Sequence, residues 1–143
     1  MDSIFFEQLL GYLDLGVFQV RVLSDGFHVD CYSNLAQGLG PKTLEKSDVV
    51  ICKRQRVVRE LSILGKAVTL HIQVRKFKSA SGTYFWEELS VVRPHSHFTK
   101  RYETFIFESC KGTDMTNVAQ KEGLSVDSVM GIFHLYAKKN LIA

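Results

Sequence analysis

Residues 115–134, MTNVAQKEGLSVDSVMGIFH, have the pattern of two short helices joined by a tight turn. Ala119 is small enough to let two helices cross at its position, and Gly123 can adopt the left-handed backbone conformation that such a turn requires. The apolar residues at the inward positions are Val118, Leu124, Val129 and Ile132. This pattern predicts a helix-turn-helix, a motif whose second helix enters a groove of DNA.

A further helix is predicted just before this motif, over residues 99–111. Gly112 should end it, and its inward side chains are expected to be Tyr102, Phe105, Ile106 and Cys110. Asp114 and Ser125 are expected to cap the two helices of the motif, the second of which should run to about residue 139. Residues 94–143 are therefore predicted to form a tri-helical helix-turn-helix unit.

The chain before residue 94 has the patterns of a small module with one helix and several strands. A helix is predicted over residues 3–14, with Phe6, Leu9, Leu10 and Leu13 on its inner face. The segments VFQVRVL and FHVDCYS flank an Asp-Gly turn at residues 24–26 and predict a β-hairpin. Glycines and Pro41 predict a loop over residues 34–47.

Two longer strands are predicted next, over residues 49–59 and 66–78. In the second, KAVTLHIQVRKFK, apolar residues alternate with polar ones, which is typical of a strand with one buried face. A turn at residues 79–82 should return the chain as a partner strand, TYFWEEL. The predicted fold class is α+β, with an antiparallel β module over residues 1–93 and the helical unit over residues 94–143.

Charge is unevenly distributed along the chain, although the formal net charge is only +3. Residues 53–78 carry eight basic side chains and one acidic side chain, whereas residues 1–52 carry an excess of acidic ones. Phosphate binding depends on the number of phosphates neutralised locally, so this basic block predicts contact with a nucleic-acid backbone. The alternative is a solvated strand edge whose lysines oppose aggregation.

Composition excludes several classes of protein. The chain has 143 residues, of which 45% are hydrophobic and 23% charged, and two prolines, so we expect a globular protein. No apolar run approaches the roughly 20 residues needed to cross a bilayer, and the acidic start MDSIFFEQLL is unlike a secretory signal. Three widely spaced cysteines, Cys31, Cys52 and Cys110, favour reduced thiols. We therefore expect a cytoplasmic, nucleoid-associated protein without membrane contact.

Several motifs together resemble the N-terminal region of the ISL-three family of insertion-sequence transposases. They are the arginine-rich stretch Arg56-Val57-Val58-Arg59-Glu60-Leu61, the strand from Gly65 to Phe77, the segment Phe85-Trp86-Glu87-Glu88-Leu89, and Thr99-Lys100-Arg101 at the start of the helical unit. The resemblance extends over roughly residues 16–140. It implies a DNA-binding region made of a zinc-binding segment followed by a helix-turn-helix.

This sequence departs from the family pattern in two places. The family usually binds zinc through two Cys-x-x-Cys pairs, but the second position here is Phe77-Lys78-Ser79-Ala80-Ser81-Gly82, and Cys31 and Cys52 form no pair. A closed structural zinc site needs four ligands, so a degenerate segment without metal is expected. The family's catalytic domain follows the helix-turn-helix, and this sequence ends at Ala143. We therefore expect no strand-transfer activity.

The resemblance and the motif together give a set of candidate DNA contacts. The exposed positions at the start of the second helix should face the bases; they are Ser125, Val126, Asp127, Met130 and His134. None of them is an arginine, asparagine or glutamine, the strongest base readers, so sequence recognition is expected to be weak. Backbone contacts are expected from Lys53, Arg54, Arg56, Arg59, Arg75, Lys76, Lys78, Lys100, Arg101, Lys121, Lys138 and Lys139.

No other chemistry is predicted with similar support. His95 and His97 have a spacing that metal pairs use, but a polar linker beside Pro94 explains them better. No nucleophile and base occur in a recognisable arrangement, so we expect no enzyme activity, no cofactor and no metal. The sequence thus predicts a non-catalytic protein that binds double-stranded DNA and regulates transcription or transposition. The alternative is a protein–protein interaction module, an adaptor or inhibitor, and Phe5 beside Phe6 suggests a homodimer contact.

Overall fold

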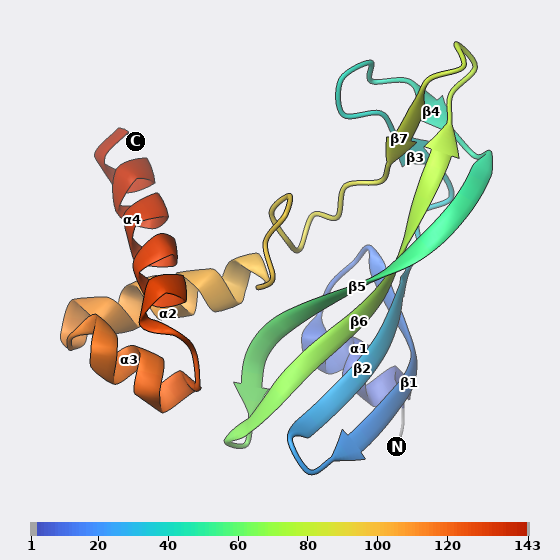
Figure 1. The fold of residues 1–143 in the computed structure, drawn as a ribbon. Coiled ribbons are helices and arrows are strands. Elements are labelled where there is room, and N and C mark those ends of the chain that lie inside the picture. Colours follow the sequence, from blue (N-terminus) through green and yellow to red (C-terminus); the bar gives the residue numbers. More distant parts are fainter. Residues whose placement is uncertain (1–2, 143) are drawn as a thin grey trace. The chain divides into compact units, whose positions relative to one another are not determined.

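The computed structural model describes residues 3–142, and its contacts divide the chain into two compact units. The first ends at Thr99 and contains every strand, and the second begins at Lys100 and contains three helices (Figure 1). Strands in the N-terminal part and helices in the C-terminal part agree with the predicted mixture of α and β structure. Each unit is described by itself below.

The N-terminal unit is a twisted sheet with one helix. Its elements are α1 (Ser3–Leu10), β1 (Leu15–Leu23), β2 (Gly26–Ser33), β3 (Gly38–Leu39), β4 (Lys46–Ser47), β5 (Val50–Ile63), β6 (Lys66–Lys78) and β7 (Tyr84–Trp86). The main sheet has the order β1-β2-β6-β5, and β7 pairs with β6. The short β3 and β4 form a separate two-stranded ladder inside the segment predicted as a loop.

The predicted antiparallel arrangement is wrong for one pair of strands, because β2 and β6 run parallel. Val29 lies opposite Leu70 and Cys31 opposite Ile72, so the two strands align their buried residues on the same face. The chain reaches this pairing by passing through β3, β4 and β5 first. Alternation along one strand does not reveal the direction of its neighbour, and therefore the sequence did not show this crossover.

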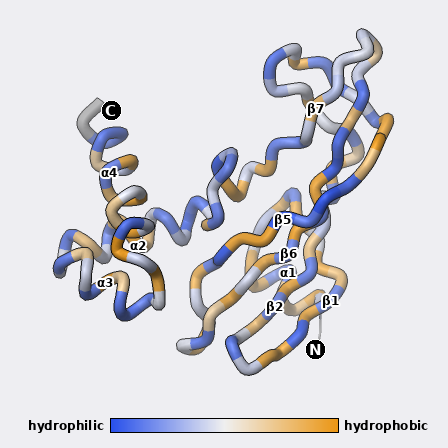
Figure 2. The backbone as a smooth tube through the Cα atoms, viewed as in Figure 1, coloured by the Kyte–Doolittle hydropathy of each residue, from blue (hydrophilic) through white to orange (hydrophobic). Residues whose placement is uncertain are grey.

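β5 and β6 form a long antiparallel ribbon joined by a two-residue turn. Leu64 and Gly65 both have positive φ angles, 52° and 75°, as the tight hairpin turn requires. Figure 2 shows hydrophilic residues along the middle of β5 and hydrophobic residues beyond them toward this turn. The ribbon therefore has an apolar half inside the core and a basic half that extends past it.

The core of the N-terminal unit lies between one face of the sheet and α1. Phe6 and Leu10 of α1 are buried there, but Leu9 and Leu13, which were also predicted to face inward, are 49% and 95% exposed. The helix ends at Leu10 because Gly11 adopts a φ of 71° and its amide donates to the Glu7 carbonyl. The predicted extension to residue 14 is therefore wrong.

The segment after β7 also belongs to the N-terminal unit. The Arg59 amide donates to the His97 carbonyl at 2.8 Å, and the Thr99 amide donates to the Arg59 carbonyl at 2.9 Å. These bonds attach residues 97–99 to β5 as a short parallel bridge. The contacts consequently place the boundary after Thr99, whereas the sequence placed it between residues 93 and 94.

The C-terminal unit consists of α2 (Lys100–Gly112), α3 (Met115–Glu122) and α4 (Val126–Ile142), which pack on one another. The inward positions of the motif are largely confirmed, since Val118, Ala119, Val129 and Ile132 are buried and Leu124 is half-buried. In α2, Tyr102 and Ile106 are buried as expected. Phe105 is 42% exposed and Cys110 is half-buried, and the core is completed instead by Glu103 and Phe107.

Candidate nucleic-acid interface

The turn between α3 and α4 has the geometry that the sequence predicted. Asp114 caps α3 by accepting the Asn117 amide at 2.7 Å. Gly123 ends this helix in the left-handed conformation with a φ of 67°, and its amide donates to the carbonyls of Ala119 and Gln120. The Leu124 amide also donates to the Ala119 carbonyl, at 2.9 Å. The exit angle from α3 is thus fixed by several hydrogen bonds.

Ser125 caps α4, as predicted, and this role occupies its hydroxyl group. The Ser125 Oγ accepts the Ser128 amide at 3.1 Å and donates to the Ser128 Oγ at 2.8 Å. A hydroxyl held in this way has little capacity left for a base edge. Ser125 therefore acts first as a structural residue of the turn.

The remaining candidate base-facing residues are exposed on α4. Val126 and Met130 are 38% and 39% exposed, and Asp127 and His134 are also exposed. Val126, Met130 and His134 are spaced four residues apart, which places them on one side of the helix. Gly131 lies beside them, and a Cβ atom added to it would meet no other atom within 4 Å. The side of α4 that carries them is therefore open and largely uncharged.

Two carboxylates link the three helices to one another, and neither was predicted from the sequence. Glu103 is fully buried and accepts the Tyr136 hydroxyl at 3.1 Å, which links α2 to α4. Tyr102 donates to the half-buried Glu122 at 2.8 Å, which links α2 to α3. The only sequence signal was that Glu103 lies at helical spacing among the apolar residues of α2.

The candidate backbone contacts of the C-terminal unit are mostly solvent-facing. Lys100, Lys121, Lys138 and Lys139 are exposed, whereas Arg101 is half-buried. The Lys139 ammonium lies 5.1 Å from the centre of the Tyr136 ring. The four lysines are thus accessible to a phosphate backbone.

In the basic block of the N-terminal unit, Arg56 is occupied by internal partners. Its Nη2 donates to the carbonyls of Arg93 and Ser96, at 2.8 and 2.9 Å, and so fastens this segment to β5. Burial, together with the nearby Arg54, lowers the pKa of Arg56 from its ordinary value. Arg56 is therefore engaged by carbonyls of its own unit rather than held free for a phosphate.

Arg75 is occupied in the same way. Its guanidinium group pairs with the buried carboxylate of Glu87, at 2.9 Å between Nη2 and Oε2 and 3.1 Å between Nε and Oε1. It also donates to the Ser33 hydroxyl at 3.0 Å and to the Leu35 carbonyl at 2.9 Å. Arg75 therefore joins β6 to the end of β2 and to the segment after β7, and its guanidinium group is engaged within the protein.

Arg59, the other arginine of the block on β5, is half-buried.

Three other basic residues of the block and two aromatic residues of β7 form what we call the aromatic–basic stripe: Arg54, Lys76, Lys78, Tyr84 and Trp86. In the β6–β7 register Lys76 lies opposite Trp86 and Lys78 opposite Tyr84, so these side chains share one face of the sheet. The Arg54 guanidinium lies 4.2 Å from the centre of the Trp86 ring, and Lys76 and Lys78 lie 5.6 and 5.7 Å from that of Tyr84.

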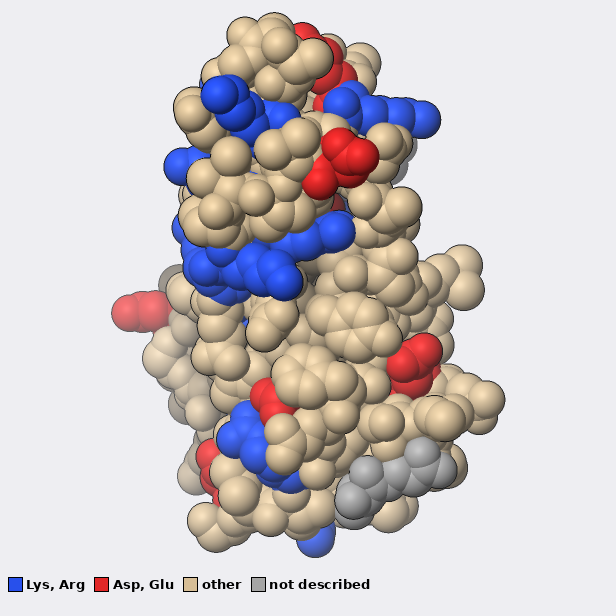
Figure 3. Space-filling view, turned by 90° about the vertical axis from the view of Figure 1, so that its right-hand side faces the viewer, with Lys and Arg blue, Asp and Glu red and all other residues tan. Residues whose placement is uncertain are grey.

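The stripe is accessible to solvent. Tyr84 is 53% exposed, Arg54 and Lys78 are exposed, and Lys76 and Trp86 are half-buried. In Figure 3 the Lys and Arg side chains gather in the upper half of the view, at the height where the β5–β6 ribbon extends past the core in Figure 1. The contact between Arg54 and Trp86 joins residues about thirty positions apart and was not predicted from the sequence. Phe85, between Tyr84 and Trp86, is buried.

Within residues 3–142, no group of three or more His, Cys, Asp or Glu side chains has a geometry that could hold a metal ion. The three cysteines are unpaired, and burial raises the pKa of the Cys31 thiol to about 12. No helix of the described part is long and apolar enough to cross a membrane.

α3, the turn at Gly123 and α4 form a helix, a tight turn and a second helix, the order of elements in a helix-turn-helix. Residues 87–137 match the family model of the helix-turn-helix domain of transposase family ISL3. The match covers less than half of the chain, and it includes the end of the N-terminal unit as well as most of the three helices. No curated protein and no solved structure matches the chain.

Proposed function

We propose that this protein is a non-catalytic, transposase-derived protein that binds double-stranded DNA through α3 and α4. The observation that carries the proposal is the capped α3–Gly123–α4 arrangement within a segment similar to a transposase helix-turn-helix domain. In this class of motif the second helix lies in the major groove. We infer that α4 is that helix and that the protein regulates transcription or transposition by occupying its DNA site.

The side of α4 that carries Val126, Met130 and His134 would face the groove. Val126 can contact a thymine methyl group and His134 can hydrogen-bond to a base edge, while no bidentate base contact is available. Gly131 leaves the helix backbone uncovered between them, which allows a close approach to the DNA. Sequence preference should therefore be modest, and shape should contribute to it.

Affinity would come mainly from phosphate contacts of both units. In the C-terminal unit these are Lys100, Lys121, Lys138 and Lys139, which are exposed. In the N-terminal unit the aromatic–basic stripe and Lys53 replace the full basic block, because Arg56 and Arg75 are bonded internally. The stripe supports this role because its cations are held side by side on one face.

Fluorescence anisotropy tests the proposal directly. The purified protein is titrated into labelled duplex DNA from its own upstream region and into a scrambled duplex, at two salt concentrations. We expect binding that weakens steeply with salt and favours the upstream duplex. Salt-sensitive binding without preference for either duplex would support the phosphate contacts and contradict the regulatory role. The absence of binding at low salt would contradict the proposal.

One observation favours the alternative of a protein interaction module. On α1, Phe6 is buried while Ile4, Phe5 and Leu9 are 66%, 57% and 49% exposed, which leaves an apolar outer surface on this short helix. A homodimer formed through α1 would also suit a DNA-binding protein with two half-sites. Sedimentation velocity distinguishes the cases: a Phe5→Ser variant should become monomeric if α1 forms the contact.

A further inference from the structure

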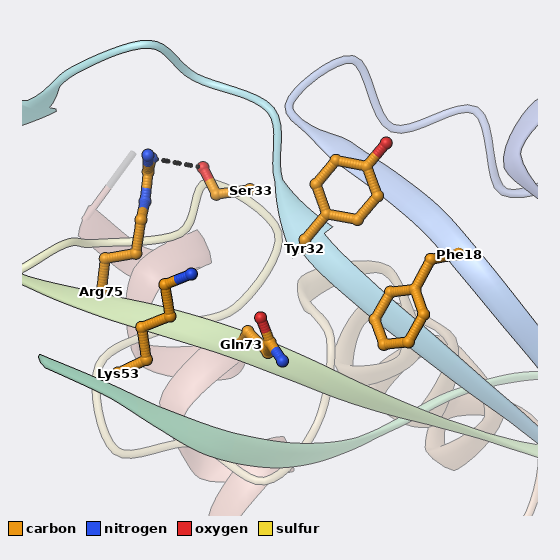
Figure 4. A pocket seen from close by; sticks show the side chains of 6 residues that line it. All are labelled: Phe18, Tyr32, Ser33, Lys53, Gln73 and Arg75. Carbon is orange, nitrogen blue, oxygen red and sulfur yellow. Dashed lines mark hydrogen bonds between the residues drawn. The ribbon is translucent and has the colours of Figure 1, made fainter.

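An open hollow of about 450 Å³ lies in the N-terminal unit, on the face of the sheet opposite the buried core. It is lined by Phe18, Tyr32, Ser33, Lys53, Gln73 and Arg75 (Figure 4). These residues come from β1, β2, β5 and β6, so the four main strands all contribute to it. Its volume is within the range of small-molecule sites.

Two aromatic rings form one wall of the hollow, and the backbone beneath them is shaped to hold them there. The β1–β2 register shifts between Val17 and Gln19, and this bulge turns Phe18 outward. Tyr32 lies across Gly16, where a Cβ atom would be only 2.2 Å from the ring carbon Cζ of Tyr32. The two ring centres are 6.3 Å apart, and the residues remain 52% and 40% exposed.

The opposite wall carries one cation whose charge is not neutralised. Lys53 and Arg75 are directly opposite each other in the β5–β6 register, a destabilising arrangement for two like charges. Glu87 neutralises Arg75, at 2.9 Å. No carboxylate of the described residues forms an ion pair with Lys53, which is exposed at the rim. The hollow therefore retains one positive charge from Lys53.

Gln73 occupies the floor between the rings and Lys53. Its side-chain amide is exposed to solvent and makes no hydrogen bond within the described part of the chain. An amide can both donate and accept, which suits the edge of a heterocyclic base. The hollow thus contains aromatic rings that can stack on a base, an amide that can hydrogen-bond to the edge of a base, and an ammonium group that can bind an anion.

We propose that this hollow binds a nucleobase together with its phosphate, with the base stacked on Phe18 and Tyr32 and the phosphate at Lys53. Proteins that bind unpaired nucleic-acid strands combine aromatic side chains with cations in this way. A base inside a duplex is already stacked and cannot enter. The ligand is therefore a free nucleotide or a nucleotide of a single strand, and its binding is independent of the proposed duplex contact of α4.

The experiment uses the full chain, a fluorescent single-stranded oligo(dT) and unlabelled AMP as a competitor. We expect the oligonucleotide to bind and Phe18→Leu to weaken it about tenfold or more, whereas Phe18→Tyr retains binding because the ring is kept. Lys53→Gln should weaken binding and reduce its dependence on salt. Displacement by AMP would identify a free nucleotide as a ligand, and displacement only by unlabelled oligo(dT) would identify a strand.

Gly16→Ala provides a second test that leaves every lining side chain in place. Its added methyl group must displace the Tyr32 ring, so the affinity for oligo(dT) should fall while the circular dichroism spectrum is unchanged. Duplex binding should be the same in Phe18→Leu and Gly16→Ala, neither of which changes a proposed phosphate contact, and this separates the site from α4. Equal oligo(dT) affinity in the wild type, Phe18→Leu and Lys53→Gln would overturn the proposal. The absence of any binding of the labelled oligo(dT) would overturn it as well.

Discussion

The two units present their positive charges in different ways. In the N-terminal unit the arginines Arg56 and Arg75 lie among carbonyls and a buried carboxylate, and each fastens neighbouring segments to the sheet. In the C-terminal unit the lysines Lys121, Lys138 and Lys139 lie on helix surfaces and remain in solvent. The number of basic residues in a segment is therefore a poor measure of the charge available to a phosphate.

The difference follows from the chemistry of the side chains and of the elements that carry them. A guanidinium group has five donors in a fixed plane and can serve several acceptors at once, which suits a strand next to loops. A lysine on a helix keeps its ammonium in water while its stem covers apolar surface.

Breaking the buried ion pair should produce the largest change. Glu87→Ala leaves the Arg75 guanidinium without its carboxylate, and the free energy of unfolding should fall by about 3 kcal/mol or more. Urea denaturation followed by the fluorescence of Trp86, the single tryptophan, measures this. Glu108→Ala, which removes the exposed partner of Lys111, should cost less than about 1 kcal/mol. Equal effects of the two substitutions would contradict the structural role of Arg75.

Removing the cations of the aromatic–basic stripe should affect binding and leave the fold intact. The variant with Arg54, Lys76 and Lys78 all replaced by Gln should bind duplex DNA about tenfold or more weakly, and its salt slope should fall by about 0.9 for each phosphate that is no longer neutralised. Anisotropy titrations at several salt concentrations measure both quantities. Lys66→Gln, near the hairpin turn of the ribbon, is the control. A salt slope equal to that of the wild type would show that the stripe does not contact the DNA backbone.

Two glycines of the C-terminal unit should respond oppositely to the same substitution. A Cβ atom meets nothing within 4 Å at either Gly123 or Gly131, so only the backbone conformation differs. Gly123→Ala should destabilise the unit by about 1 kcal/mol because its φ is 67°, and Gly131→Ala within α4 should stabilise it by about 1 kcal/mol. Thermal unfolding by circular dichroism checks the signs. Destabilisation by both would contradict the helix boundaries.

The smallest expected effect concerns pH and the sheet face of the N-terminal unit. Burial, Arg21 and His28 lower the pKa of His71. His71 Nε2 lies 2.8 Å from His28 Nδ1, and His28 Nε2 lies 2.7 Å from Asp25. The folded state favours neutral His71. Its contribution to the free energy of unfolding is therefore present above the unfolded pKa of 6.5 and is lost as the pH falls through the lower pKa of the folded state.

Urea denaturation at a series of pH values checks this effect. The wild type should lose stability on acidification below 6.5, and His71→Gln should lose less over the same interval. If the stability of His71→Gln has the same pH dependence as that of the wild type, His71 does not contribute to the loss of stability in acid.

Local signals predicted the C-terminal unit well, and long-range contacts limited the prediction of the N-terminal unit. The caps at Asp114 and Ser125 and the turn at Gly123 each depend on residues within a few positions, so the sequence contains them directly. The parallel pairing of β2 with β6 depends on residues about forty positions apart, and alternation does not encode it. The charge count likewise could not show that Glu87 would neutralise Arg75.

We propose that α4 faces duplex DNA, and the substitution Val126→Glu tests this. A carboxylate in the first turn of a helix is favourable to the helix, so the fold should be retained. The same carboxylate placed against a groove repels phosphates, so anisotropy titration with the upstream duplex should show a loss of affinity of about tenfold or more. Affinity equal to that of the wild type, in a variant with unchanged helicity, would contradict the claim.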